Sequence, residues 1–251
     1  MKKISAVIIC KDEESNIEDC LKSILWCDEI IIIDSFSKDS TLKIAKIYTD
    51  NIFQNEWKGF SNQRKFALTK INYEWIISLD ADERCGSELK NEINSVLSKD
   101  NIPEKGFLIP RKSFFLGKWV RHCGWYPDHQ LRLFRKDSVY IGERLVHEGY
   151  EVNGETGKLK NDILHYTVNS ISEFMSRINL YSTLSANEKM SDRKIGVAYI
   201  LIKPFLEFMK KYIFQMGFMD GITGVMVCYF HMMTKTLTYM KIREMQNKIN
   251  K

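Results

Sequence analysis

Apolar runs of strand length alternate with helical patterns over the first hundred residues. The runs are Ile4–Cys10, Glu29–Ile33, Asn51–Gln54 and Trp75–Leu79, and most are rich in isoleucine or other strand-forming residues. Between them, apolar residues recur three and four positions apart, as on one face of a helix. The alternation predicts βαβ units, and right-handed crossovers then place the loops after Cys10, Ile33 and Leu79 at one edge of a parallel sheet.

The pattern becomes less regular after residue 105. Gly106–Phe115, Gln130–Arg135 and Ser138–Ile141 have the composition of shorter strands. Further on the pattern is helical, and Ser170 with Glu173 has the spacing of a capping box, as Ser15 with Glu18 has earlier in the chain.

These patterns predict two parts of unequal size. We expect an α/β catalytic domain over residues 1–168, divided into a first half over 1–100 and a second half over 101–168. A helical extension over 169–251 follows. A chain of 251 residues is long enough for one such domain with an appendage.

Charge is distributed unevenly along the chain. From Arg193 to Lys251 there are ten basic and three acidic side chains, whereas the preceding residues carry 27 basic and 29 acidic ones. A basic segment predicts a polyanionic partner, either a membrane or a nucleic acid. This segment is rich in Met and Phe, which suits a lipid surface better, and we expect no nucleic acid as partner.

The uncharged apolar run of the C-terminal segment is too short to predict a membrane span. The uncharged run from Gly221 to Thr234 has 14 residues, and about 18–20 are needed to cross a bilayer. Amphipathic helices lying on an anionic membrane surface fit the pattern. The alternatives are helices packed onto the core or onto a second copy of the chain in a homodimer.

Other compositional features limit the class of protein. The six cysteines form no C-x-x-C pair, which favours reduced cytoplasmic thiols over a zinc site. The first apolar run, of about seven residues, is too short for a signal peptide. No strand–helix junction has the glycine spacing of a dinucleotide fold or of a P-loop.

A cluster of carboxylates directly follows the strand Trp75–Leu79. Asp80, Asp82 and Glu83 stand where open α/β sheets hold their ligands. Two converging carboxylates repel each other unless a divalent cation, shared with phosphate oxygens, lies between them. The cluster therefore predicts a metal–nucleotide site, and the alternative is an acidic loop that caps the next helix.

Four motifs, in this order, resemble those of family 2 glycosyltransferases with the GT-A fold. They are Val7–Glu14, Ile31–Thr41, Gln63-Arg64-Lys65 and Leu79–Glu83. The resemblance implies an α/β fold with a mostly parallel central sheet flanked by helices, followed here by an α-helical C-terminal extension. Two positions depart from the family pattern, because Asp12 and Lys65 each stand where asparagine is common.

Three motifs in the second half resemble a subgroup of that family. They are Trp125–Arg135, Val146-His147-Glu148 and Asp220-Gly221-x-x-Gly224. Members of this subgroup add glucose, or a related sugar, to the inner core of lipopolysaccharide. The resemblance thus implies a cytoplasmic enzyme on the inner face of the membrane, with a UDP-sugar donor and a glycolipid or saccharide acceptor.

The resemblance also implies roles for individual residues and an inverting transfer assisted by Mg²⁺ or Mn²⁺. It assigns the nucleotide to Cys10, Glu13, Asp34, Arg64 and Asp80; the metal to Asp80, Asp82 and His147, with His165 as the alternative histidine; the catalytic base to Asp128; and the acceptor or phosphate to Gln130, Arg132 and Trp125.

The chemistry of glycosyl transfer needs these residue types. A leaving diphosphate needs countercharge, which Arg64 and a divalent ion would supply. The acceptor hydroxyl needs a base, and partial desolvation of Asp128 in its aromatic loop would strengthen it. The aromatic residues of that loop would form a wall facing the sugar, or else serve only as packing anchors. Two other functions stay open: sugar transfer to a polyprenyl phosphate, and a non-catalytic scaffold that binds nucleotide sugars.

Overall fold

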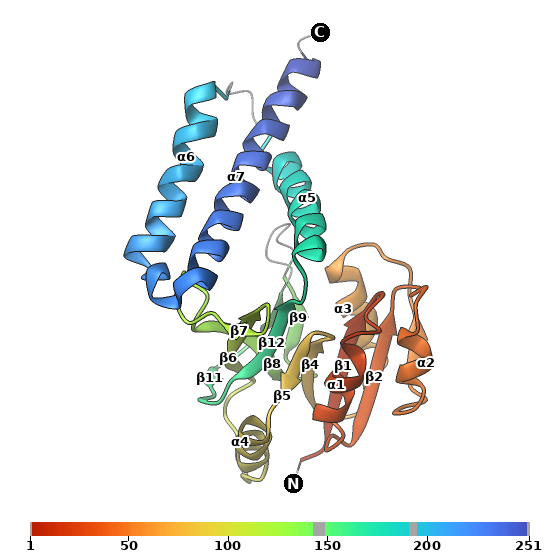
Figure 1. The fold of residues 1–251 in the computed structure, drawn as a ribbon. Helices are drawn as coiled ribbons and strands as arrows, with labels where there is room; N and C mark the ends of the chain where they lie inside the picture. The colour runs from red at the N-terminus through yellow and green to blue at the C-terminus, as the bar shows by residue number, and fades with distance from the viewer. Residues whose placement is uncertain (1, 143–148, 191–194, 250–251) are drawn as a thin grey trace. The chain divides into compact units, whose positions relative to one another are not determined.

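The structure is a computed structural model and describes residues 2–142, 149–190 and 195–249 (Figure 1). The chain packs into two compact units. The N-terminal unit consists of residues 1–111 and 128–165, and the helical unit consists of residues 112–127 and 166–251. The domain boundary expected after residue 168 would separate parts that fold independently, and it stays a prediction.

The central sheet is mixed, with strand order β3-β2-β1-β4-β8-β6-β12-β5. Its first four strands are parallel, as expected: β1 (Ile4–Cys10), β2 (Glu29–Asp34), β3 (Ile52–Gln54) and β4 (Trp75–Asp80). The other four strands in this order are β5 (Glu83–Cys85), β6 (Gly106–Phe115), β8 (Asp128–Arg135) and β12 (Ile163–Val168). Strand β8 pairs antiparallel with both β4 and β6, and β12 pairs antiparallel with β5.

Four shorter strands remain. Strand β7 (Lys118–Trp119) has two residues and pairs with the end of β6. Strand β11 (Thr156–Lys158) pairs in parallel with the start of β6. Strands β9 (Val139–Ile141) and β10 (Tyr150–Val152) form a separate antiparallel pair.

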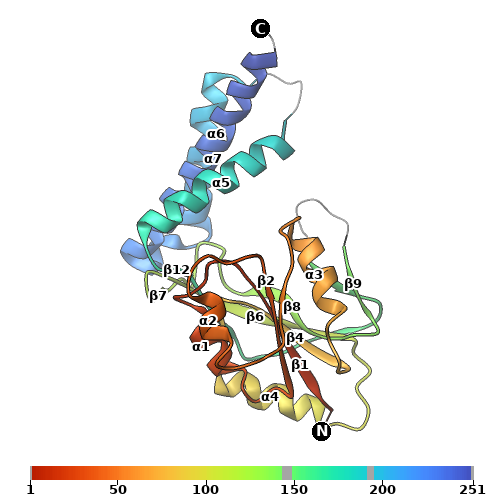
Figure 2. The same cartoon turned by 90° about the vertical axis from the view of Figure 1, so that its right-hand side faces the viewer.

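The parallel strands β1, β2 and β4 are largely apolar because both of their faces are covered. In β2, Ile30 and Ile32 join the core cluster that contains residues of α1 (Ile17–Ser23), α2 (Thr41–Ala45) and α4 (Ser87–Leu97). Ile31 and Ile33 join the cluster on the other face, beneath α3 (Phe60–Leu68) and the β9–β10 pair (Figure 2). Alternate side chains of a strand point to opposite faces, so burial of both faces favours a nearly continuous apolar run.

The two predicted capping boxes have different outcomes. The side chain of Ser170 accepts a hydrogen bond from the backbone N–H of Glu173 at 3.1 Å and caps α5 (Ile171–Glu188). The box predicted for Ser15 and Glu18 is wrong, because α1 begins one residue later and Asn16 is its N-cap.

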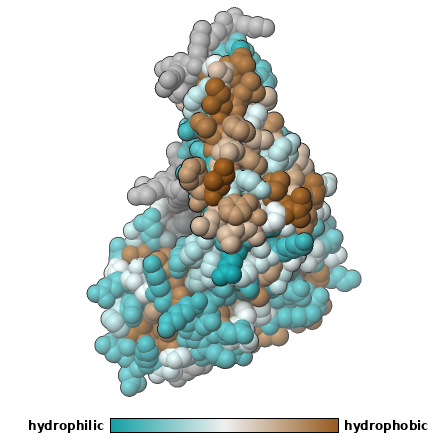
Figure 3. Space-filling view, turned by 60° about the vertical axis from the view of Figure 1, so that its left-hand side comes forward, coloured by the Kyte–Doolittle hydropathy of each residue, from teal (hydrophilic) through white to brown (hydrophobic). Residues whose placement is uncertain are grey.

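The helical unit is built around α5, α6 (Val197–Met209) and the long α7 (Gly221–Ile249). Between α6 and α7 the chain forms a π-helical turn η1 (Lys210–Phe214) and a 3₁₀ turn η2 (Gly217–Asp220). Figure 3 shows hydrophobic side chains gathered over the helices of this unit. Its buried cluster contains Phe115, Val120, Cys123, Val168, Ile178, Val227, Cys228 and Phe230.

The motif Asp220-Gly221-x-x-Gly224 forms the tight junction between η2 and α7. The carboxylate of Asp220 accepts the backbone N–H of His122 at 2.8 Å and lies 2.8 Å from the Nδ1 atom of its ring. A Cβ atom at Gly224 would overlap the carbonyl oxygen of Gly217. Only glycine therefore permits this close approach of two backbone segments.

Within the described residues, no single helix is long and apolar enough to cross a membrane. The segments Val197–Phe214 and Gly217–Lys248, which meet at an angle of 72°, have the length and composition for it only when taken together.

Candidate active site

The loops after β1 and β2 are tied together at the carboxyl edge of the parallel strands. Asp12 has a φ of 53°, a left-handed conformation that Asp and Asn adopt more readily than most other residues. Its carboxylate accepts the backbone N–H of Lys38 at 2.7 Å, and its own N–H donates to the Ser37 hydroxyl at 2.8 Å. An aspartate therefore suits the position where asparagine is common in the family.

Asp34 is fully buried at the end of β2. Its carboxylate accepts the Ser37 hydroxyl at 2.5 Å and the side-chain amide of Gln54 at 3.0 Å. The Cys10 thiol lies 3.9 Å away, and burial, together with the Asp34 charge, raises the pKa of that thiol. Cys10 is therefore a neutral thiol at this edge, and the nucleotide contacts expected of both residues stay predictions.

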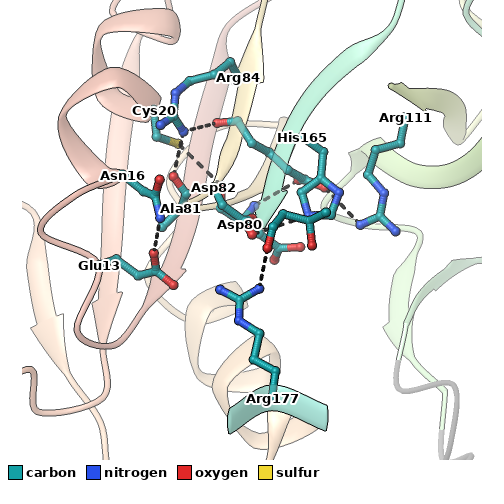
Figure 4. Close-up of polar contacts among 12 residues, drawn as sticks. Glu13, Asn16, Cys20, Asp80, Ala81, Asp82, Arg84, Arg111, His165 and Arg177 are labelled. Atoms are coloured by element: carbon teal, nitrogen blue, oxygen red, sulfur yellow. Dashed lines mark hydrogen bonds and ion pairs between the residues drawn. The ribbon is translucent and has the colours of Figure 1, made fainter. Parts of the chain in front are cut away.

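Glu13 lies in the loop between β1 and α1, four residues before the helix begins. Its backbone N–H donates to the Thr41 hydroxyl at 2.7 Å, and its carboxylate accepts the Asn16 amide at 2.8 Å (Figure 4). The helix α1 and the loop before α2 are thus joined at the rim where the base contact of Glu13 is predicted.

Asp80 and Glu83 share one buried guanidinium. The Nη2 atom of Arg132 donates to Asp80 and, at 2.7 Å, to Glu83. Glu83 is fully buried and Arg132 nearly so, whereas the Asp80 side chain is 41% exposed. Asp80 thus keeps a surface that a ligand can reach, while Arg132 is held between two carboxylates, and the ligand role predicted for Arg132 stays a prediction.

The electrostatics of this cluster differ between the two acids. Burial alone would raise the pKa of Asp80, but Arg132, with Arg64 and Arg111, holds it below its usual value. Burial, with the neighbouring Asp80 charge, raises the pKa of Glu83 despite the arginines. Burial would lower the pKa of Arg132, but the two carboxylates raise it further, so its charge is permanent. The cluster therefore places one exposed anion, Asp80, over a buried cation.

Asp82 faces a histidine of strand β12, far from it in the sequence. The Nε2 atom of His165 lies 3.4 Å from the Asp82 carboxylate (Figure 4). The pairing of β12 with β5 brings it there, because His165 stands opposite Glu83 in the strand register. In the part of the chain that the structure describes, no three His, Cys, Asp or Glu side chains form a complete metal site.

Asp128 begins β8 directly opposite Arg111 of β6. Both bonds from Arg111 reach one carboxylate oxygen, from Nε at 3.0 Å and from Nη2 at 2.5 Å, and the Gln130 amide donates to the other at 2.8 Å. The Nη1 atom of Arg111 also reaches Glu83 at 3.3 Å. One continuous network therefore joins Asp128 to Asp80 through Arg111, Glu83 and Arg132.

Arg64 lies on α3, with its guanidinium 5.4 Å from the ring centre of Tyr150. Its charge contributes to the lowered pKa of Asp80. The structure thus brings Arg64 to the acid cluster, and its predicted approach to a diphosphate stays a prediction.

Two predicted site residues are not part of this cluster as described. His147 lies outside the described residues. Trp125 belongs to the helical unit, where its ring centre is 6.4 Å from that of Phe115 in the apolar cluster. Its predicted contact with acceptor or phosphate stays a prediction.

Sequence reasoning missed the roles of Arg111 and Glu83. Glu83 belongs to the acidic triplet, and its place next to Asp82 was the one available signal. Arg111 lies 17 residues before Asp128, and only the antiparallel register of β6 and β8 brings the two together.

Comparison with known proteins places the chain in a class. Residues 5–101 match the sequence profile described as Glycosyl transferase family 2. The chain is 29% identical over 247 residues to the lipopolysaccharide core biosynthesis glycosyltransferase LpsC of Rhizobium meliloti, covering 90% of this chain and 89% of LpsC. It is 25% identical over 260 residues to an uncharacterized glycosyltransferase of Rickettsia typhi, covering 99% and 89% of the two chains.

The fold is also similar to that of a solved glycosyltransferase. The structure of residues 1–349 of S. aureus TarS in complex with UDP-GlcNAc matches with a TM-score of 0.50 and 13% identity, covering 98% of this chain and 92% of that one. The profile match and the relatives identify a glycosyltransferase, and the fold is GT-A-like. Residues 5–101 thus resemble glycosyltransferase family 2, and the two relatives named above are glycosyltransferases.

Proposed function

We propose that this protein transfers a sugar, glucose in the first instance, from a UDP-sugar to a lipopolysaccharide core or a similar glycolipid, with inversion at the anomeric carbon. The similarity to LpsC over nine-tenths of both chains supports the acceptor class. The observation that carries the proposal is the network from Asp128 through Arg111 and Glu83 to Arg132 and Asp80. It joins a candidate base to a candidate diphosphate site.

Asp82, His165 and the exposed side of Asp80 are the groups that would hold a divalent cation. Two or three protein donors are enough when substrate phosphates complete the coordination, as they often do for Mg²⁺. The approach of His165 to Asp82, at 3.4 Å, supports this histidine as the ligand. Carboxylate donors suit Mg²⁺ or Mn²⁺, and the added imidazole favours Mn²⁺. When bound, the cation would neutralise charge that develops on the leaving diphosphate.

Asp128 is the residue that would accept the proton of the attacking hydroxyl. Arg111 and Gln130 fix the orientation of its carboxylate, and the oxygen that accepts the single bond from Gln130 keeps a further lone pair for a substrate hydroxyl. Loss of the proton as the new bond forms makes the acceptor oxygen a better nucleophile toward an oxocarbenium-like centre. Arg64 would bind the diphosphate oxygens as they gain charge.

The exposed apolar side chains of the helical unit support association with an anionic membrane surface. Among the most exposed are Leu201, Phe205, Leu206, Phe214, Met219 and Ile222. Such a surface is large for a protein that is free in solution. The basic excess of the same segment would attract anionic lipids. Packing against a second copy of the chain is the competing explanation of the same surface.

A thermal-shift panel tests the donor class. The purified protein is heated with UDP, GDP or CMP, each with and without Mn²⁺. We expect a rise in melting temperature with UDP that depends on Mn²⁺, because a ligand that binds only the folded state stabilises it. The rise should disappear in Asp82→Ala. A response to GDP alone would favour a polyprenyl-phosphate acceptor, and no response to any nucleotide would contradict the proposal.

Turnover of the Asp128→Asn variant tests the base. Asparagine keeps the size of the side chain and can still meet Gln130, but it cannot accept a proton. We expect the transfer rate to fall by about 10²–10⁴-fold while the UDP-induced thermal shift is retained. The control is Asp137→Asn, which changes an exposed aspartate at the other end of β8. Near-normal transfer by Asp128→Asn would show that another group is the base.

A further inference from the structure

A cavity with basic walls lies within the helical unit. Its volume is about 230 Å³; it is open to solvent and is lined by the end of α6, the turn η1 and the middle of α7. The lining side chains are those of Glu207, Lys210, Lys211, Gln215, His231 and Lys235. Three lysines therefore meet one glutamate, and that glutamate has Lys203 at 3.9 Å on its own helix.

The positive charge of this cavity is not balanced by the protein. Among the described residues, neither Lys210 nor Lys235 has a carboxylate within ion-pair distance, and the Nζ atom of Lys211 donates to a backbone carbonyl, that of Cys123, at 2.9 Å. Burial lowers the pKa of Lys211 and of Lys235, and neighbouring lysines add to it. Three crowded cations of this kind attract an anion that can accept hydrogen bonds from all of them.

The chemistry and the surroundings favour a lipid phosphate. A phosphate group offers several strong acceptor oxygens and fits easily into a cavity of this volume. The same turn η1 that supplies Lys210 and Lys211 also exposes Ile213 and Phe214, the latter to 81%. Apolar side chains beside a basic cavity between helices match the two ends of an anionic lipid.

We propose that this cavity binds the phosphate headgroup of an anionic lipid, with the acyl chains against the exposed side chains of η1. The inference rests on the membrane association proposed above and not on the transfer reaction. Lys210 and Lys235 lie on different elements and, among the residues that the structure describes, are the two lysines of the cavity for which no side-chain hydrogen bond or ion pair is found, so they carry the test.

Vesicle co-sedimentation without nucleotide tests the proposal. The full chain is mixed with vesicles of phosphatidylcholine alone, or of phosphatidylcholine with phosphatidic acid. The test variant is Lys210→Gln/Lys235→Gln. The control is Arg243→Gln/Lys248→Gln, which removes the same charge from the far end of α7, about 12–20 Å from Lys235 along the helix axis. That distance exceeds the range of unscreened attraction at physiological salt.

We expect phosphatidic acid to promote binding, and the cavity variant to bind roughly twenty-fold more weakly while the control stays within about threefold of the native chain. Equal losses in both variants would overturn the proposal in favour of unspecific attraction. Binding that is independent of phosphatidic acid would also overturn it, yet leave membrane association standing. Both variants replace partly exposed side chains, and their melting curves verify that they are folded.

Soluble phosphates distinguish the source of the headgroup. Inorganic phosphate and glycerol phosphate are added in a thermal-shift assay of the native chain and the cavity variant. Stabilisation that needs Lys210 and Lys235, combined with unchanged vesicle binding by the variant, would assign the cavity to a soluble phosphate and overturn the lipid proposal. UDP-dependent stabilisation is measured separately, so failure of the cavity proposal leaves the transfer reaction untouched.

Discussion

At the scale of single residues, the acid cluster depends on the guanidinium of Arg132. It is nearly buried and bonds to both Asp80 and Glu83, and Glu83 has no access to solvent. A charge in such a place is stable only while its partner remains, because an unpaired buried carboxylate loses its hydration without compensation. The geometry that leaves Asp80 accessible to a ligand therefore requires Arg132 beneath it.

We predict that Arg132→Met destabilises the protein by about 3–5 kcal/mol, since methionine fills the space and leaves Glu83 with only its longer ion pair to Arg111. The measurement is urea unfolding followed by circular dichroism. Adding Glu83→Gln to this variant should recover part of the loss. The control is Arg135→Met on the same strand, whose ion pairs with Glu74 and Asp137 are surface pairs. It should cost less than about 1 kcal/mol. Equal costs would mean that the buried pair is not the cause.

The residue scale also shows how far sequence reasoning reaches. Asp80 and Asp82 could be predicted because a strand and its outgoing loop are local. The contact of Arg111 with Asp128 could not, because it depends on a strand pairing that includes a register shift between Phe107 and Leu108. The burial of Arg132 was equally hidden, since an arginine in an alternating strand reads as exposed and polar.

At the scale of elements, the parallel strands were the part most open to prediction. Strands buried on both faces have nearly continuous apolar runs, and these runs coincide with β1, β2 and β4. Helix ends were less predictable. The capping box predicted at Ser15 is wrong, because the next residue, Asn16, is the N-cap of α1, and its side chain bonds to Glu13. The junction of η2 with α7 depends on a backbone contact that no sequence pattern displays.

We predict that Gly224→Ala destabilises the helical unit by about 2–4 kcal/mol. The new Cβ atom would overlap the backbone carbonyl oxygen of Gly217, which cannot move without separating η2 from α7. Thermal unfolding followed by circular dichroism measures the loss. The control is Gly196→Ala, where a Cβ meets no atom within 4 Å, and it should change stability by less than about 1 kcal/mol. A Gly224→Ala variant as stable as that control would show that the junction yields easily.

At the scale of the whole molecule, the two units divide the chemistry between them. The acidic network lies in the N-terminal unit, and the basic excess predicted from the sequence lies in the helical one. The sum of charges could be read directly from the chain. Its concentration around one cavity could not, because Lys210 and Lys235 lie 25 positions apart and meet only through the bend between α6 and α7.

This concentration of charge makes the helical unit sensitive to acid through His231. Burial, with the charges of Lys211, Lys235 and Lys210, lowers the pKa of His231 from 6.5 to about 4. The charged groups that line the cavity with it are these lysines, on η1 and α7, and Glu207 on α6. Between about pH 4 and pH 6.5 the folded protein keeps His231 neutral, whereas the same histidine in the unfolded chain binds a proton. The stability it contributes is therefore complete above pH 6.5 and is lost as the pH falls toward about 4.

We predict that the native chain loses about 1–2 kcal/mol more than His231→Gln over this pH interval. A pKa shift of this size would correspond to ~3 kcal/mol for a fully buried group. The expected loss is smaller because His231 is only partly buried. Urea unfolding at several pH values measures both proteins, and their difference cancels the carboxylates that titrate in each. His129→Gln, which changes an exposed histidine of β8, should follow the native curve. Parallel curves for the native chain and His231→Gln would mean that the lysines do not raise the cost of charging His231.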